Sequence, residues 1–206
     1  AITGKMFEIK RYTPQDKTIW DQYVSKARNA TFLFYRDYMD YHSNRFHDYS
    51  LMFFKNGRLH SLLPAHSSDD ILCSHFGLTY GGLIMDINVT IAETCQLFEC
   101  LNNYLRLKGF RHVQYKAIPW IYHQVPSEED LYAIFWKCGA KLSTRNVGTT
   151  IFIQQNLKWR RNHLRQLKKA CLNGITVQRG ADIAEFWPVL ELSLIHISEP
   201  TRQAEI

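Results

Sequence analysis

A basic stretch in the last quarter of the chain carries its strongest charge signal. Six cations lie within twelve residues that contain no acid: Lys158, Arg160, Arg161, Arg165, Lys168 and Lys169. Without them, the 25 Lys and Arg fall to 19 and balance the 19 Asp and Glu, so the net charge of +6 belongs to this segment. The spacing of Leu157, Leu164 and Leu167 predicts an amphipathic helix over 157–172. A helix face rich in cations and free of acids could bind the phosphates of nucleic acid or of an anionic membrane surface. A face that is only exposed to solvent would have the same composition.

A glycine-rich segment is the second candidate for chemistry. Three of the six residues from Gly77 to Gly82 are glycine. Glycine permits positive φ and lets a ligand approach the backbone closely. Tyr80, Gly81 and Gly82 are therefore candidate substrate-binding residues, whose main-chain N–H groups would hold a carbonyl or a phosphate. A β-bulge or a tight connection would use the same glycines.

The third candidate is the aromatic segment YKAIPWIYH at 115–123. It predicts a strand that ends at Pro119 and leads into a run of aromatic rings, which supply flat apolar walls with polar tips. The candidate substrate-binding residues here are Tyr115, Lys116, Trp120 and Tyr122. Simple packing at a sheet edge would also explain each of them. A phenol with its usual pKa near 10 is a poor base at neutral pH, so the catalytic base stays unassigned.

Several well-known site motifs are missing from the sequence. No histidines stand in HxH or HExxH spacing, so we expect no metal site. Walker A, Rossmann G-x-G-x-x-G and G-x-S-x-G motifs are also missing. Cys/His/Asp and Ser/His/Asp arrangements stay open, because such partners need not be close in sequence.

Apolar periodicity and turn signals predict the elements that would position these residues. Thr13-Pro14 and the capping box Thr90/Glu93 each open a helix, and Asn56-Gly57 joins two strands as a hairpin. Strands are expected at 7–10, 50–54, 59–65, 71–74, 112–118 and 175–178, with a closing hairpin at 141–145 and 149–153. Helices are expected at 14–27, 35–46, 90–109, 127–139 and 156–173, and from 181 onward.

This order predicts a mixed α/β (α+β) fold with one mixed, partly antiparallel sheet flanked by helices. The hydrophobic content of 46% and the charged content of 21% exclude a disordered, collagenous or disulfide-scaffold protein. The chain contains no apolar run of membrane-spanning length and no signal-peptide pattern. Five cysteines without a CxxC pair favour reduced thiols, so we expect a cytoplasmic protein.

The last fifteen residues read differently from the rest. Residues 192–202 spell LSLIHISEPTR, which matches the in-frame translation of a common transposase sequencing adapter. We therefore expect residues 192–206 to be non-native and native sequence to stop near Glu191, in mid-helix. Met6 is a candidate for the true start.

Taken together, several segments resemble bacterial GNAT-like proteins of the Fem type. The resemblance lies in FLFYRDYM at 32–39, the turn Tyr80-Gly81-Gly82, KAIPWIYH at 116–123 and EEDLYA at 128–133. The run RRNHLRQLKK at 160–169, followed by NGITV at 173–177, is similar to the helix and strand that open the second domain in that family. The resemblance covers about residues 6–191.

This resemblance implies two tandem GNAT-type domains, with residues 6–153 as the first and residues 154–191 as the truncated start of the second. It implies transfer of an acyl or aminoacyl group to a small-molecule or peptide amine acceptor. The acyl donor would be either an aminoacyl-tRNA, which makes tRNA a partner, or an acyl-CoA. The acetyl-CoA signature R/Q-x-x-G-x-G/A is missing. A different interpretation is a non-catalytic module that binds RNA or another anion through the helix at 157–172.

The resemblance also implies where the cleft lies. GNAT-type folds place ligands where central strands diverge, and this would be where the Tyr80-Gly81-Gly82 turn meets the strand of Tyr115 and Lys116. Lys116 would pair with an anionic acceptor, and free backbone N–H groups beside the glycines would orient the acyl carbonyl. We expect the 206-residue fragment to be inactive by itself.

Overall fold

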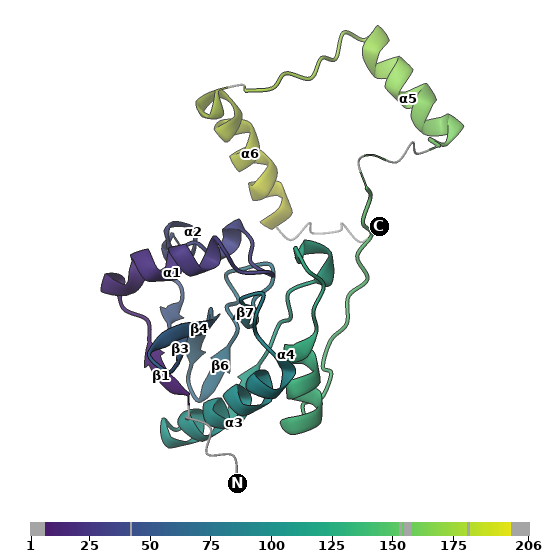
Figure 1. Cartoon of the computed structure of the whole chain (residues 1–206). Helices are drawn as coiled ribbons and strands as arrows, with labels where there is room; N and C mark the ends of the chain where they lie inside the picture. Colours follow the sequence, from purple (N-terminus) through teal and green to yellow (C-terminus); the bar gives the residue numbers. More distant parts are fainter. Residues whose placement is uncertain (1–6, 42, 153, 155–157, 181, 199–206) are drawn as a thin grey trace, which may run out of the picture. The chain divides into compact units, whose positions relative to one another are not determined.

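The computed structural model describes residues 7–41, 43–152, 154, 158–180 and 182–198 (Figure 1). Contacts divide the chain into two units, Ala1–Thr150 and Ile151–Ile206. The first unit belongs to the mixed α/β class, as the sequence predicts.

The first unit has short elements joined by tight turns. Its strands are β1 (Glu8–Arg11), β2 (His47–Asp48), β3 (Leu51–Lys55), β4 (Arg58–Leu63), β5 (His66–Ser68), β6 (Ile71–Cys73), β7 (Ile84–Met85) and β8 (His112–Gln114). Its α-helices are α1 (Lys17–Val24), α2 (Arg36–Asp40), α3 (Ile91–Leu107) and α4 (Glu129–Tyr132). Single 3₁₀ turns lie at Pro14–Asp16, Phe32–Phe34 and Trp120–Tyr122, and a π-helical turn at Ala133–Lys137 follows α4.

The strands form two four-stranded sheets rather than the single sheet that the sequence predicts. Sheet A has the antiparallel order β1-β3-β4-β7, and sheet B has the order β2-β5-β6-β8, in which β6 and β8 run parallel. The chain passes between the sheets at Pro64, which has no N–H to continue the ladder of β4. The Tyr49 N–H still donates to the Ala65 carbonyl at 2.8 Å, so the two sheets stay connected.

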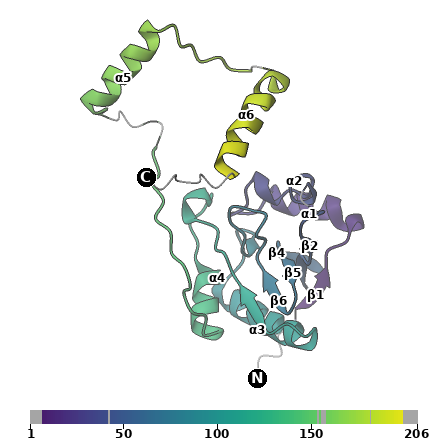
Figure 2. The same cartoon turned by 180° about the vertical axis from the view of Figure 1, so that it is seen from behind.

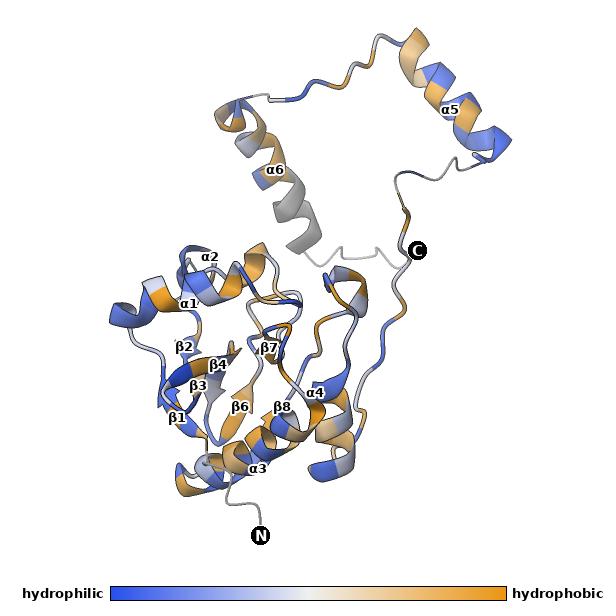
Figure 3. Cartoon of the chain, viewed as in Figure 1, coloured by the Kyte–Doolittle hydropathy of each residue, from blue (hydrophilic) through white to orange (hydrophobic). Residues whose placement is uncertain are grey.

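Sheet A is buried on both faces. Side chains alternate along β3, so that Leu51 and Phe53 join the core under α3, whereas Met52 joins the core under α1 and α2. Figures 1 and 2 show α1 and α2 on one side of the strands and α3 on the other. Because both faces of sheet A are buried, its strands have continuous apolar runs in the sequence. The hydropathy colours of Figure 3 show apolar residues on α3 as well.

Two local signals are confirmed. Asn56 and Gly57 have φ of 53° and 73° and form the two-residue turn between β3 and β4, which pair from Lys55↔Arg58 onward. The capping box of Thr90 and Glu93 opens α3. The face of α3 that carries Leu97, Leu101 and Leu105 is buried against the sheet, as its spacing predicts.

Several predicted boundaries are wrong. The helix expected at 35–46 ends at Asp40, because the chain turns there and brings Asp48 and Ser50 to the buried Arg36 guanidinium, each at 3.2 Å. The strand expected at 112–118 ends at Gln114, since the Lys116 N–H donates to the Ser74 hydroxyl at 2.6 Å instead of to a strand.

The closing hairpin at 141–153 and the strand at 175–178 do not form in the described parts of these ranges. Their described residues are exposed and have no partner strand. Alternating apolar residues suit a strand, but a strand also needs a neighbouring strand with which its N–H and C=O groups can pair.

One edge of sheet A is closed by the segment before α2. The Asn29 side chain donates to the Leu83 carbonyl and accepts from the Met85 N–H, both at 2.8 Å. The Arg28 N–H adds a hydrogen bond to the Met85 carbonyl at 2.9 Å. Asn29 is buried and satisfies both ends of its amide in this way.

The described residues of the second unit form the helices α5 (Arg161–Leu172) and α6 (Ile183–Ser198). α5 ends at Asn173 and Gly174, where Gly174 has φ of +72°. The predicted cap Asn156 and the apolar Leu157 lie outside the described residues. The backbone of α6 continues past Leu192, while the side chains of 193–198 and residues 199–206 lie outside the described part, so the origin of this tail stays a prediction.

Candidate functional site

The glycine turn meets residues 115 and 116, which follow the end of β8, with close backbone contact. The Gly81 N–H donates to the Lys116 carbonyl at 3.0 Å. A Cβ atom on Gly81 would lie 2.2 Å from the Ser74 carbonyl oxygen, and one on Gly82, whose φ is +99°, would lie 3.1 Å from the Tyr115 hydroxyl. Both glycines are thus required by packing within the fold. Because the Gly81 N–H is already bonded, it is not the free donor for an acyl carbonyl that we expected.

Tyr115 is the central polar group of this junction. Its hydroxyl accepts from the Leu83 N–H at 2.7 Å and donates to the carboxylate of Asp130. Burial raises the pKa of Tyr115 well above its usual value, and the neighbouring Asp130 raises it further. Burial also raises the pKa of Asp130. Tyr115 therefore holds α4 to the glycine turn and is not a proton acceptor at neutral pH.

The other predicted residues of this group are also close together. Tyr80 stacks on Tyr122 with ring centroids 5.0 Å apart, and its hydroxyl donates to Thr31 at 3.0 Å. The exposed Lys116 ammonium donates to the Leu78 carbonyl at 3.3 Å. Six of the seven candidates thus form one group by direct contacts, and their part in substrate binding stays a prediction.

Trp120, the seventh candidate, lines a surface hollow of about 470 Å³ together with Pro126, Ser127 and Glu128. Trp120 is 58% exposed. The Ser127 hydroxyl oxygen is shut off from solvent and has no hydrogen-bond partner among the described residues. From the sequence, Ser127 and Glu128 were expected only at the start of a helix.

His123 is a partly buried residue between Tyr122 and the start of α4. Both of its ring nitrogens are removed from solvent, and neither makes a hydrogen bond of good geometry in the described part of the structure. Burial lowers the pKa of His123 and outweighs the opposing effects of the Asp130 carboxylate and the Ile118 carbonyl. His123 is therefore neutral at physiological pH.

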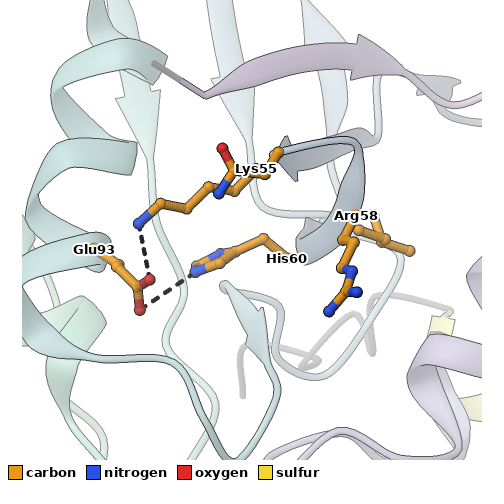
Figure 4. A pocket seen from close by; sticks show the side chains of 6 residues that line it. Lys55, Arg58, His60 and Glu93 are labelled. Carbon is orange, nitrogen blue, oxygen red and sulfur yellow. Dashed lines mark hydrogen bonds and ion pairs between the residues drawn. The ribbon is translucent and has the colours of Figure 1, made fainter. Parts of the chain in front are cut away.

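A second hollow, of about 510 Å³, lies at the β3–β4 hairpin and the start of α3, as Figure 4 shows. The Lys55 ammonium contacts Glu93 at 2.8 Å, and His60 Nε2 lies 3.7 Å from the same carboxylate. Burial alone would raise the pKa of Glu93, but hydrogen bonds from Lys55 and Thr90 lower it to about 2. Burial lowers the pKa of His60, against the pull of Glu93. These groups neutralise one another and tie the hairpin to α3, which is a structural role.

The six predicted cations of the basic segment are all exposed, on α5 and the residues before it. None of them forms an ion pair with a described residue, and Arg165 donates to the Asn162 side chain at 3.2 Å. Leu164 and Leu167 of the predicted apolar stripe are exposed too. The helix expected over 157–172 is shorter than predicted: it begins at Arg161, so Lys158 and Arg160 precede it in extended chain, and the ligand of these cations stays a prediction.

Within the described ranges, no group of three His, Cys, Asp or Glu side chains is arranged to hold a metal ion. A membrane-crossing helix, one both long and apolar enough, does not occur there either. All five cysteines are free thiols.

No known protein-family model matches the chain. A search of curated proteins also finds no match. Among solved structures, the chain is similar to an aminoglycoside acetyltransferase from an uncultured soil metagenomic sample, in complex with sisomicin, with 13% sequence identity and a TM-score of 0.38. The alignment covers 73% of this chain and 97% of that one. A likeness at this TM-score says nothing about what this chain binds or catalyses.

Proposed function

We propose that the chain is an N-acyltransferase of the GNAT/Fem-type superfamily, which transfers an acyl or aminoacyl group to an amine acceptor. One observation carries the proposal: segments of the Fem-type resemblance that lie far apart in sequence meet at one place. The Gly81 N–H bonds the Lys116 carbonyl, Tyr80 stacks on Tyr122, and Tyr115 bonds Asp130. Residues 6–153 would form the first GNAT-like domain and residues 154–191 the beginning of a second.

The reaction requires a neutral amine. Its nitrogen lone pair attacks the acyl carbonyl carbon, the bond to the thiol of CoA or to the ribose oxygen of an aminoacyl-tRNA breaks, and the amine proton passes to a base. Tyr115 is unsuited as that base, because its pKa is raised by burial and by Asp130. We leave the choice between the two donors to experiment.

A second candidate function is binding of RNA through the basic helix, without catalysis. The observation that favours it is the set of exposed cations on and before α5, none of which pairs with an acid in the described structure. In a Fem-type enzyme the same surface would contact the donor tRNA, so RNA binding alone fits both functions.

The test measures transfer and RNA binding separately. The product of the intact open reading frame and the 206-residue chain are each incubated with an amine panel and either acetyl-CoA or aminoacyl-tRNA, and acylated amines are detected by mass spectrometry. Transfer by the longer protein alone is expected. Transfer by residues 1–191 alone would overturn the two-domain proposal. If neither protein transfers an acyl group and both bind RNA, the non-catalytic function replaces the enzyme.

The RNA arm has a matched control. Six phosphate contacts would cost about 10³-fold in affinity between 50 and 200 mM salt. Changing Arg161, Arg165 and Lys168 to Gln should weaken tRNA binding and flatten this salt dependence. Changing the exposed Lys26, Lys141 and Arg145 to Gln removes the same charge elsewhere and should leave binding nearly unchanged. If the two triple variants weaken tRNA binding equally, the binding comes from the general positive charge of the chain and not from the basic helix.

A further inference from the structure

Helix α5 has two faces of different chemistry, and both are exposed. Successive residues of an α-helix are rotated by about 100°, so Leu164, Leu167 and Cys171 share one face. Leu164 and Leu167 are 50% and 62% exposed. The hydropathy colours of Figure 3 show hydrophobic and hydrophilic residues interleaved along α5. The neighbouring face carries the exposed cations Arg161, Arg165, Lys168 and Lys169.

The apolar face of α5 is not covered within the second unit. Among residues 151–192, none that the structure describes is buried, so Leu164 and Leu167 have no core to pack into. Helices in proteins take most of their stability from packing an apolar face against something else. A helix with this pattern is therefore expected to place its leucines against a partner.

The cations beside this face identify the chemistry of the partner. None of them forms an ion pair with a described acid, and residues 158–169 contain no Asp or Glu. A partner that covers both faces must present negative charge next to an apolar interior. An anionic lipid bilayer does so, because its phosphates lie at the surface and its acyl chains lie directly below them.

RNA would account for one of the two faces only. Its phosphates pair with Arg and Lys, but a helix held on the phosphate backbone leaves Leu164 and Leu167 in water. Trp159, just before α5, is 63% exposed, and its ring lies 6.3 Å from that of His163, one turn before Leu167. Indole rings are enriched where a membrane meets water. The apolar face thus favours lipid over RNA as the partner of α5.

We propose that α5 binds along the surface of an anionic bilayer, with Leu164 and Leu167 among the upper acyl chains and its Arg and Lys side chains on the lipid phosphates. The helix has 12 residues and is about 18 Å long. A bilayer core of about 30 Å is too thick for it to cross, so it lies in the plane of the interface. Long Arg and Lys stems let the charges reach the headgroups from there. This binding does not require the transferase activity proposed above.

Vesicle co-sedimentation of the whole 206-residue chain tests the proposal. One set of vesicles contains phosphatidylcholine and phosphatidylglycerol at about 2:1, and the other contains phosphatidylcholine alone. Each Lys or Arg near an anionic surface strengthens binding about fivefold, so the anionic vesicles should bind about 100-fold more tightly or better.

A double variant tests the apolar face. Leu164→Gln with Leu167→Gln keeps every cation and should weaken binding to the anionic vesicles about tenfold or more, because two apolar side chains no longer leave water. Its matched control is Leu107→Gln with Leu142→Gln, which changes two exposed leucines of the first unit and should leave binding unchanged. All four leucines are exposed, so the fold should persist in both variants, as circular dichroism would show.

A triple variant tests the charged face. Changing Arg161, Arg165 and Lys168 to Gln should weaken binding to the anionic vesicles about 100-fold. Changing the exposed Lys26, Lys141 and Arg145 to Gln removes the same charge from the first unit and should have little effect.

Each competing partner has its own result. If the chain binds tRNA but neither kind of vesicle, RNA is the partner of α5 and the membrane proposal falls. It also falls if the double leucine variant binds anionic vesicles as tightly as wild type, since the contact is then charge attraction alone. A second copy of the chain is the partner if this variant dissociates an oligomer in lipid-free sedimentation. If the product of the intact open reading frame does not bind vesicles whereas the 206-residue chain does, the remainder of that protein covers the face and the proposal is refuted.

Discussion

Replacing Glu93 by Gln should remove a link between α3 and the β3–β4 hairpin whose strength depends on pH. Gln at this position can still accept from the Thr90 N–H in the capping box, so the change removes mainly the charge that meets Lys55. Figure 4 shows both partners at the hollow.

The pKa of Glu93 sets an upper bound on the effect. It falls from the ordinary value of 4.5 to about 2, and at about 1.4 kcal/mol for each tenfold change in proton affinity this gives about 3.4 kcal/mol. The Glu93 and Lys55 side chains are 27% and 24% exposed, so solvent screens part of their attraction. We therefore expect a loss of about 1–2 kcal/mol in the free energy of unfolding at pH 7.

The sign of the pH dependence follows from a lowered acid pKa. The contribution is fully present above about pH 4.5, where the unfolded chain also carries the charge, and it is lost as the pH falls toward 2. Urea unfolding of wild type and Glu93→Gln at a series of pH values measures it, with Glu8→Gln as a control, because Glu8 forms no ion pair with a described residue. A wild-type advantage of equal size at pH 7 and pH 2 would refute the reasoning.

Three further substitutions test the packing of the first unit. Gly81→Ala should cost at least about 2 kcal/mol in urea unfolding, because its Cβ would lie 2.2 Å from the Ser74 carbonyl oxygen; a neutral result would mean that the turn is looser than described. Tyr115→Phe should cost about 2–4 kcal/mol by leaving the buried Asp130 without its donor, and this cost should shrink in an Asp130→Asn background. Leu101→Ala should cost about 2–5 kcal/mol by opening a cavity under α3, and thermal unfolding unchanged by this substitution would contradict the described core.

The elements that the sequence predicts well are those fixed by neighbours in the chain. Thr90 and Glu93 bond each other three residues apart, and Asn56-Gly57 turns the chain by its own φ preference. The strands expected at 141–153 and 175–178 depend on a distant partner, which alternation alone cannot reveal. Pro64 is a signal in the sequence that would have predicted the break between the two sheets.

The contact between the glycine turn and residues 115–116 was predicted, but the hydrogen bonds made there were not. The prediction that other groups approach the backbone of Gly81 and Gly82 closely is confirmed. The groups that do so are Ser74 and Tyr115 of the same chain and not a ligand.

The amide of Asn29 has a consequence for how the chain behaves among copies of itself. Strand β7 ends sheet A, and a bare strand at that position would offer its N–H and C=O groups as a template for another chain. Asn29 occupies the Leu83 carbonyl and the Met85 N–H, and the Arg28 backbone occupies the Met85 carbonyl. At the opposite edge, β1 carries Glu8, Lys10 and Arg11. Hydrogen bonds therefore occupy the polar backbone groups at the β7 edge, and charged side chains lie along the β1 edge. Both features disfavour the addition of a strand from another chain to sheet A, which is the first step toward aggregation.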